Sequence, residues 1–268
     1  MKQYNEFTEK DFTFVVCTYK ECEYLEECIC SLVNQTVKAN ILISTSTPND
    51  YVQGIADKYG IEVRVNPDGG QIKDYNFAMK QPDTELVMLM HQDEVLVHTF
   101  VERVLFELNH AKKPIIAFTN YLEMHNDVVD KKPSVMVGIK RIMLLPSLVR
   151  GLSGTWLGKR GIQLLGDPIT HPTVVCVRKE MPDEIFREKY KASMDWDLWE
   201  RLSRQEGSFV YVKDVLLYHR MNDENQTVKL LNTTNARYED EYEIFCRFWP
   251  KPIAKFIMKF YSGAAKFY

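Results

Sequence analysis

A pair of adjacent carboxylates is the sharpest local signal for chemistry in this sequence. Asp93 and Glu94 belong to His91-Gln-Asp-Glu94, which follows the apolar run 85–90. A carboxylate pair directly after a buried strand is unfavourable for stability, but its oxygens suit a divalent cation. The alternative is that both acids begin the next helix, whose dipole favours negative charge there. Spacing alone leaves both interpretations open.

A second group of acids stands in Met194-Asp-Trp-Asp-Leu-Trp199. Asp195 and Asp197 are two residues apart, so on a helix they point in different directions and at most one faces a site. Spacing alone favours the alternative that both are first-turn acids, each stabilising the helix by about 0.3–1 kcal/mol. Trp196 and Trp199 are expected in the core rather than on a sugar-binding surface.

These side chains need a scaffold, and the first half of the chain alternates strand and helix patterns. Strands are expected at 12–17, 40–44, 61–65 and 85–90, with helices at 21–35, 51–59 and 72–80. This alternation predicts an α/β fold with a parallel, doubly wound sheet and flanking helices. Ligands bind such sheets at the carboxyl ends of the strands. The polar segments expected there are Thr18–Glu21, Ser44–Thr47 and His91–Glu94.

After about residue 98 the alternation loosens. Segment 131–166 looks irregular or loosely helical and mixes basic with apolar residues. Further helices are expected at 99–111, 194–205 and 235–249, and strands at 114–119, 173–178, 208–212 and 215–218. Neither an internal repeat nor a clear linker interrupts this pattern.

Composition narrows the functional classes. The chain has 268 residues, 45% of them hydrophobic and 12% aromatic, which suffices for a large core. Its 34 basic and 37 acidic residues leave a net charge of −3, which gives no electrostatic case for binding nucleic acid. No apolar run is long enough for a membrane span, and the polar N-terminus 1–11 is unlike a secretory signal. An intracellular, cytoplasmic location is therefore expected.

Missing motifs exclude further classes. The sequence has no G-x-G-x-x-G after its first strand and no G-x-x-x-x-G-K-[ST], which argues against a dinucleotide-dependent dehydrogenase and a P-loop NTPase. A nucleotidyltransferase usually carries a glycine-rich basic loop after the first strand, and Thr18–Glu21 lacks glycine. The six cysteines form no C-x-x-C pair and are expected to be inert thiols.

An ordered set of short segments carries a family resemblance. The segments are Phe12-Thr-Phe-Val-Val-Cys-Thr-Tyr-Lys20, Tyr24-Leu-Glu-Glu-Cys-Ile29, Ser31-Leu-Val-Asn-Gln-Thr36, His91-Gln-Asp-Glu94, Asp195-Trp-Asp-Leu-Trp199 and Leu217-Tyr-His-Arg220. This set resembles the family 2 glycosyltransferases, which have the GT-A fold, a mostly parallel central sheet with flanking helices. The resemblance covers residues 12 to about 228. It implies a GT-A domain at 1–230, with a donor half at about 1–97 and an acceptor half at about 98–230, and a helical extension at 231–268.

The resemblance also implies roles for individual residues. Asp93 matches the last position of the family's D-x-D segment and is the expected ligand of Mg²⁺ or Mn²⁺ beneath the diphosphate. Asp195 matches the general base that acts on the acceptor hydroxyl. The residues expected to bind the nucleotide-sugar donor are Thr18, Tyr19, Thr45, Asp74, Asn76, His91, Gln92 and Arg220.

The activity implied by the resemblance is an inverting, hexosyltransferase-type sugar transfer. A nucleotide-diphosphate donor, by family habit a UDP-sugar, would give its sugar to a hydroxyl of a glycan or lipid-linked acceptor in polysaccharide biosynthesis. A metal and an arginine can neutralise the departing diphosphate, and one base permits in-line displacement. The alternative is a non-catalytic nucleotide-sugar-binding protein, because His91 replaces the first acid of D-x-D and Asn222 stands where the family often has a histidine.

The C-terminal segment 251–268 has four lysines and no acid. Ile253, Phe256, Ile257, Phe260 and Tyr261 recur there at helical spacing. A basic amphipathic helix can lie on an anionic membrane, which predicts peripheral contact at the inner face of the membrane. The alternative is that this helix packs on its own domain or on a second subunit of a homodimer.

Overall fold

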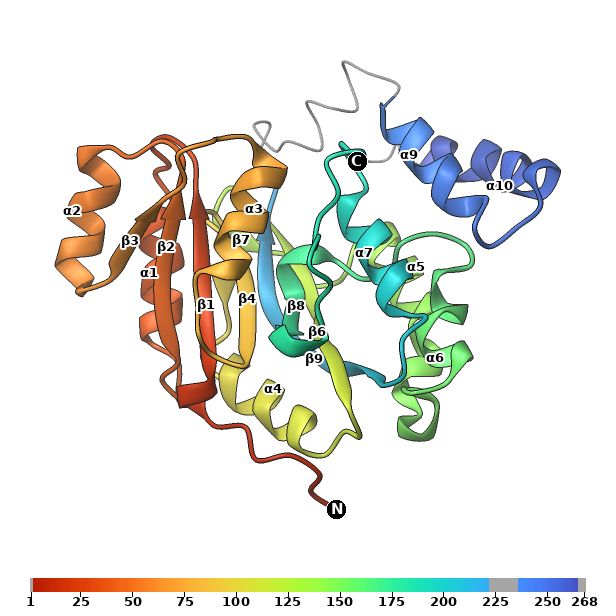
Figure 1. Ribbon diagram of the computed structural model, residues 1–268, viewed down its shortest axis with the longest axis horizontal. Coiled ribbons are helices and arrows are strands. Elements are labelled where there is room, and N and C mark those ends of the chain that lie inside the picture. The colour runs from red at the N-terminus through yellow and green to blue at the C-terminus, as the bar shows by residue number, and fades with distance from the viewer. Residues whose placement is uncertain (1, 222–235, 265–268) are drawn as a thin grey trace.

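The computed structural model of the protein describes residues 2–221 and 236–264. One sheet of nine strands forms its centre (Figure 1). The strands are β1 (Phe12–Thr18), β2 (Asn40–Thr45), β3 (Glu62–Val65), β4 (Leu86–His91), β5 (Val95–Leu96), β6 (Pro114–His125), β7 (Val128–Val129), β8 (Val174–Val177) and β9 (Ser208–Arg220). They run in the order β3-β2-β1-β4-β8-β6-β9-β5, and β7 pairs with β6.

Helices pack on both faces of this sheet. They are α1 (Leu25–Val33), α2 (Asp50–Tyr59), α3 (Gln71–Lys80), α4 (Phe100–Asn109), α5 (Val135–Met143), α6 (Trp156–Lys159), α7 (Met194–Leu202), α9 (Ala236–Phe245) and α10 (Lys251–Ala264). Because side chains alternate along a strand, Phe14 and Val16 of β1 join the core under α1, α2 and α4. Val15 between them joins the core under α3 and α7.

Parallel pairing dominates the sheet. β1 is parallel to both β2 and β4, and β2 is parallel to β3. The long pairing of β6 with β9 is also parallel, whereas the antiparallel pairings cover only two or three residues each. The structure therefore confirms the predicted α/β class with its mostly parallel sheet and flanking helices.

The second half departs from the expected boundaries in two strands. The runs 208–212 and 215–218 are one strand, β9, because β6 continues to His125 and pairs with all of it. Thr119 pairs with Val212 and Asn120 pairs with Val215, so the register shifts there and the polar residues Lys213 and Asp214 lie outside the register between the two runs. The turn character that suggested a break is thus an irregularity within a continuous strand.

The irregular and C-terminal segments also take defined forms. Segment 131–166 contains α5, α6 and short 3-10 turns, and the extension contains α9 and α10. Within residues 2–221 and 236–264, none of the helices has the length and apolarity to cross a bilayer. The expected boundaries at residues 97 and 230 stay predictions, and Asn222 lies outside the described residues.

Two buried carboxylates join α7 to its neighbours. Asp197 is fully buried and accepts hydrogen bonds from Arg187, Arg201 and Arg247. Burial raises the pKa of Asp197, but the arginine hydrogen bonds outweigh it and the pKa is lowered overall. Glu200, also buried, pairs with Arg247 and with two further arginines, Arg160 and Arg204. Residues that precede α7 and residues that follow α9 are held together by these charges.

We predict that Asp197→Asn lowers the free energy of unfolding by about 3–5 kcal/mol, because it leaves three partly buried arginines without their counter-charge. The more exposed pair of Arg103 with Asp214 provides the matched control, and Asp214→Asn should cost less than about 1 kcal/mol. Urea denaturation at pH 7 measures both. Equal losses in the two variants would contradict the role given to the buried network.

Candidate functional site

The carboxyl ends of β1, β2 and β4 bring three polar segments to one edge of the sheet. β1 lies between the other two strands, with Thr18 opposite Thr45 and Cys17 opposite His91. The segment that follows β1 therefore lies between the segments that follow β2 and β4. This arrangement is the one expected at the ligand-binding edge of a doubly wound sheet.

The turn after β1 is held by its neighbours on both sides. The Gln92 side chain accepts a hydrogen bond from Tyr19 N at 3.0 Å and donates one to Tyr19 O at 3.3 Å. Lys20 has a φ of 57°, a left-handed conformation that costs energy for a residue with a Cβ. Its N–H donates to the Thr47 hydroxyl at 2.6 Å, which helps to hold that conformation. The Tyr19 side chain itself is 51% exposed.

Thr18 and Thr45 lie deeper at the same edge, and both are buried. The Thr45 hydroxyl donates to Thr18 O at 3.1 Å and accepts from Thr47 N at 3.1 Å. Thr45 therefore supports the turns, and its direct contact with a donor stays a prediction. The Thr18 Oγ1 atom, in contrast, is buried without a hydrogen-bond partner in the protein. A ligand hydroxyl or phosphate that reached this atom would satisfy it.

Asp74 and Asn76, both on α3, join separate parts of the site. The Asp74 carboxylate accepts from the Ser46 hydroxyl at 2.8 Å and from the Asn66 amide at 2.7 Å. Asn76 exchanges two hydrogen bonds with the main chain of Phe186, at 2.7 and 2.9 Å. These contacts position the loops after β2 and β3 and the segment before α7. Whether either residue also binds the donor stays a prediction.

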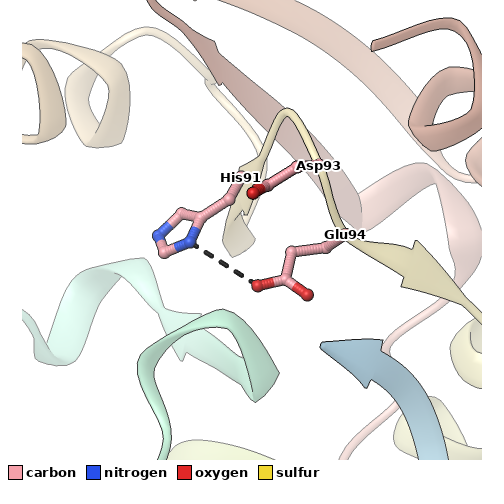
Figure 2. A group of neighbouring side chains, drawn as sticks. All are labelled: His91, Asp93 and Glu94. Carbon is pink, nitrogen blue, oxygen red and sulfur yellow. Dashed lines mark ion pairs between the residues drawn. The ribbon is translucent and has the colours of Figure 1, made fainter. Parts of the chain in front are cut away.

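His91, Asp93 and Glu94 cluster around the turn after β4 (Figure 2). One ligand atom from each of them lies within 4.8 Å of the others. His91 Nδ1 is 3.8 Å from Glu94 Oε1, and its Nε2 hydrogen-bonds the Tyr75 hydroxyl at 3.1 Å. His219 Nδ1 lies 2.6 Å from the same Glu94 oxygen. Two histidines thus flank the buried Glu94.

A divalent cation fits this cluster. Glu94 Oε2 is buried and has no hydrogen-bond partner in the protein, which leaves a carboxylate oxygen available as a ligand. Burial raises the pKa of Asp93, and the neighbouring charge of Glu94 raises it further, although His91 and His219 act in the opposite direction. A cation bound by Asp93, Glu94 and His91 would relieve this repulsion. The unpartnered Glu94 oxygen therefore supports a metal site independently of the sequence spacing of Asp93 and Glu94.

Arg220 lies at the end of β9 and is 97% buried by its surroundings, with only 3% of its surface exposed. Its Nε donates to Asp93 O at 3.2 Å. Its other nitrogens pair with Asp127 and Glu27, and its guanidinium lies 3.8 Å from the centre of the Tyr24 ring. Arg220 therefore touches the turn that carries the candidate metal ligands.

Asp195, the predicted general base, lies in the first turn of α7. Its carboxylate accepts from Trp196 N at 2.8 Å, and burial raises its pKa despite that bond and the nearby charge of Lys140. The next acid, Asp197, is bound by the arginines described above, so at most one of the two acids, Asp195, is left for the site. Trp196 and Trp199 are buried, which confirms that they belong to the core.

The Tyr75 hydroxyl is affected by the charges of both candidate catalytic acids. Burial raises its pKa most, and the charges of Asp93 and Asp195 both add to that effect, so both carboxylates are within electrostatic reach of its hydroxyl. Its ring also contacts His91 and His171. Burial lowers the pKa of His171 to about 3, so this histidine is neutral.

Tyr75, His171 and His219 have no role predicted from the sequence. Two of them had a local signal. Tyr75 lies inside the segment that contains Asp74 and Asn76, and His219 precedes Arg220 in the Leu217–Arg220 run. His171 stands alone in an irregular segment, so only the tertiary structure reveals it.

Comparisons with known proteins bear on the family and the fold of the chain. Residues 13–177 match the family model described as glycosyl transferase family 2. No curated protein shows significant sequence similarity to the chain. Similar solved structures include S. aureus TarS, with a TM-score of 0.59 and 16% identity over 92% of this chain and 42% of that one. Another is S. aureus TarS 1-349 in complex with UDP-GlcNAc, with a TM-score of 0.62 and 16% identity over 92% of this chain and 70% of that one.

The two structures establish a shared fold. The chain spans less than half the length of the longer TarS chain. A third similar structure is TarS 1-349 in complex with UDP, with a TM-score of 0.57 and 16% identity over 88% of this chain and 70% of that one.

We predict that Mn²⁺ binds the His91, Asp93 and Glu94 cluster. Asp93→Ala should weaken Mn²⁺ binding at least about tenfold, since loss of even an outer partner of a metal ligand costs about 10–100-fold. Electron paramagnetic resonance of free Mn²⁺ measures the affinity. A second cluster of Glu123, His125 and Asp130 gives the control, Asp130→Asn, which should change nothing. Loss of binding in that variant alone would move the metal to the second cluster.

Proposed function

Because the chain belongs to glycosyl transferase family 2, we propose that it is an inverting glycosyltransferase with a nucleotide-diphosphate-sugar donor. The observation that supports this most directly is the cluster of His91, Asp93 and Glu94 at the carboxyl end of β4, with a second acid, Asp195, whose charge acts on the same Tyr75 hydroxyl as that of Asp93. Such a pair can serve the two ends of a displacement, the leaving diphosphate and the attacking hydroxyl. The complexes of TarS with UDP-GlcNAc and with UDP support a UDP-sugar as the donor.

The donor would bind at the edge formed by the strands β1, β2 and β4. In this proposal, Thr18 and Tyr19 contact the nucleotide, and the unpartnered Thr18 hydroxyl has a hydrogen bond to offer. Gln92 and Thr45 act mainly through the main chain of the turn that they hold. Asp74 and Asn76 keep the surrounding loops in place.

The leaving diphosphate would lie over the turn after β4. Asp93, Glu94 and His91 would hold Mg²⁺ or Mn²⁺, which when bound supplies positive charge that stabilises the departing phosphates. Arg220 adds a fixed cation beside this turn. Its ion pairs with Glu27 and Asp127 keep the guanidinium in position before any ligand arrives.

The acceptor hydroxyl would lie beside Asp195. Its oxygen attacks the anomeric carbon as the bond from that carbon to the diphosphate oxygen breaks, and Asp195 takes the hydroxyl proton. Because attack and departure occur on opposite faces, the anomeric configuration inverts. Burial makes Asp195 a stronger base than an exposed aspartate, since it raises the pKa of the carboxyl group.

One observation favours a second candidate function. His91 occupies the first position of the D-x-D segment, and its Nε2 already hydrogen-bonds Tyr75. A protein that binds a nucleotide-sugar without turning it over would tolerate this change.

We further propose that the transferase works in polysaccharide assembly at the inner face of a membrane, on a glycan or lipid-linked acceptor. The basic helix α10 supports that setting.

We predict that the protein releases UDP from a UDP-sugar in the presence of Mn²⁺, with water as the acceptor. Asp195→Asn should lower this rate by about 10²–10⁴-fold, because general-base catalysis contributes that much. The affinity for UDP, measured by calorimetry, should change less than about twofold. Asp214→Asn, a matched change at an exposed surface pair, should leave both quantities unaltered. Binding of UDP-sugars without release of UDP from any of them would favour the non-catalytic protein.

We predict that the rate of UDP release has an acidic limb that belongs to Asp195. The base must be ionised, and its pKa is raised above the ordinary 3.8, so the rate should begin to fall at a higher pH than for an exposed aspartate. Below that point it should fall about tenfold per pH unit. The pH profile of kcat/KM measures this. The residual rate of Asp195→Asn should lack the limb, and an unchanged limb there would assign it to another group.

A further inference from the structure

Helix α5 buries Val137 in the core but also carries apolar residues on its exposed side. Val135 is 80% exposed, Ile139 44% and Ile142 66%. These residues are spaced four and three apart, so they form one apolar stripe along the outer side of the helix. A soluble helix normally turns such a stripe toward its core.

The cationic residues of α5 point the other way. Lys140 donates to the Thr170 hydroxyl at 3.1 Å, and Arg141 donates to Tyr121 O at 2.7 Å. The charge of Lys140 lowers the pKa values of Asp167 and Asp195, although burial, the larger effect, raises both. The inner side of α5 therefore faces the acids of the candidate site, which leaves its apolar side outward.

The apolar surface continues beyond α5. Its exposed side chains are Leu145, Leu148, Val149, Trp156, Leu157 and Leu165. Residues 131–166 contain no acid, while their basic residues are Lys131, Lys132, Lys140, Arg141, Arg150, Lys159 and Arg160. Exposed apolar residues together with cations and a tryptophan are typical of segments that lie in a membrane interface.

A basic pocket adjoins this surface at Trp156. Its volume is about 560 Å³, and it lies between α6 and the end of α7. Its lining residues include no acid, and its charged members are Lys159, Arg160, Arg204 and Arg247. Buried Glu200 pairs with all three arginines, and Arg247 also pairs with buried Asp197, so part of this charge is neutralised from beneath. The pocket remains a suitable place for an anionic group that arrives from outside.

Helix α10 extends the same end of the molecule (Figure 1). The Trp249 indole donates to Leu164 O at 2.8 Å, and the Tyr261 hydroxyl lies 3.5 Å from Asp167 N, so α10 and the turn before it are anchored to the end of segment 131–166. Phe256 and Phe260 are exposed, and the centres of their rings lie 5.1 Å apart. Exposed lysines accompany them in every turn.

We propose that this docking face, formed by the exposed apolar residues of α5, α6 and α10 with their surrounding cations, binds an anionic phospholipid membrane. The apolar side chains would enter the interface, while the lysines and the basic pocket meet phosphate headgroups. A second copy of the chain is disfavoured as the occupant, because a symmetric dimer would bring two acid-free, cationic segments against each other.

The docking face explains how the site could meet a membrane-bound acceptor. Because α5 has its apolar side outward and the charge of Lys140 acts on Asp195, docking would bring the candidate base toward the lipid surface. This consequence rests on the proposed transferase function, whereas membrane binding itself does not.

Co-sedimentation with vesicles tests the proposal. The full chain should bind mixed vesicles in which about one lipid in three is anionic phosphatidylglycerol and the rest is phosphatidylcholine. It should bind vesicles of pure phosphatidylcholine more weakly. The double variant Ile139→Ser and Ile142→Ser should bind the mixed vesicles at least about tenfold more weakly, because it removes two inserted apolar side chains. Val135→Ser, at the most exposed position, provides an independent second variant.

Val65→Ser is the matched control, because Val65 is exposed on β3 at the opposite end of the sheet (Figure 1). It should bind vesicles like the parent. Circular dichroism should show unchanged melting for all variants, and UDP release without vesicles should be unaltered, which separates this proposal from the proposed function. Equal binding by parent and double variant would overturn it. The proposal would also be overturned if light scattering showed that the parent forms a dimer without lipid and that the double variant is a monomer.

Discussion

The buried carboxylate of Asp197 is the constraint on which the candidate site depends. A charge with no exposure must be neutralised, and here three arginines from the segment before α7, from α7 and from the chain after α9 supply the neutralisation. Because Asp195 stands two positions earlier on the same helix, it points about 200° away from Asp197. Holding Asp197 among the arginines therefore turns Asp195 toward the cluster around Tyr75.

The opposite wall of the site depends on a different constraint, the side-by-side ending of parallel strands. The main-chain turn after β1 cannot satisfy its own groups, and Gln92 and Thr45 from the two neighbouring segments do so. One wall is thus fixed by buried charge and the other by side-chain hydrogen bonds to backbone. Two oxygens remain without partners between these supports, Thr18 Oγ1 and Glu94 Oε2. Both belong to residues at the ligand-binding edge, where an incoming ligand can complete the network.

Charge also relates the site to the surface. The pKa values of Asp93, Asp167 and Asp195 are all raised, chiefly by burial. The charge of Lys140 on α5 counters this effect at Asp167 and Asp195, and the Lys140 side chain donates a hydrogen bond to Thr170. With Lys140 and Arg141 hydrogen-bonded to the rest of the domain and Val137 in the core, Val135, Ile139 and Ile142 are left on the exposed side of α5. A membrane-bound acceptor would make use of that same orientation.

The sequence by itself determined the strand and helix alternation of the first half, because buried parallel strands and amphipathic helices each leave a local hydrophobic pattern. It also located His91–Glu94 at a strand end, and the ordered segments indicated the family that the comparison with the family model then showed. The tertiary structure decided what spacing left open. It assigned Asp197 to a buried ion network, joined 208–212 and 215–218 into β9, and brought His171 and His219 to His91 and Glu94. These outcomes depend on contacts between residues far apart in the chain, which no local pattern records.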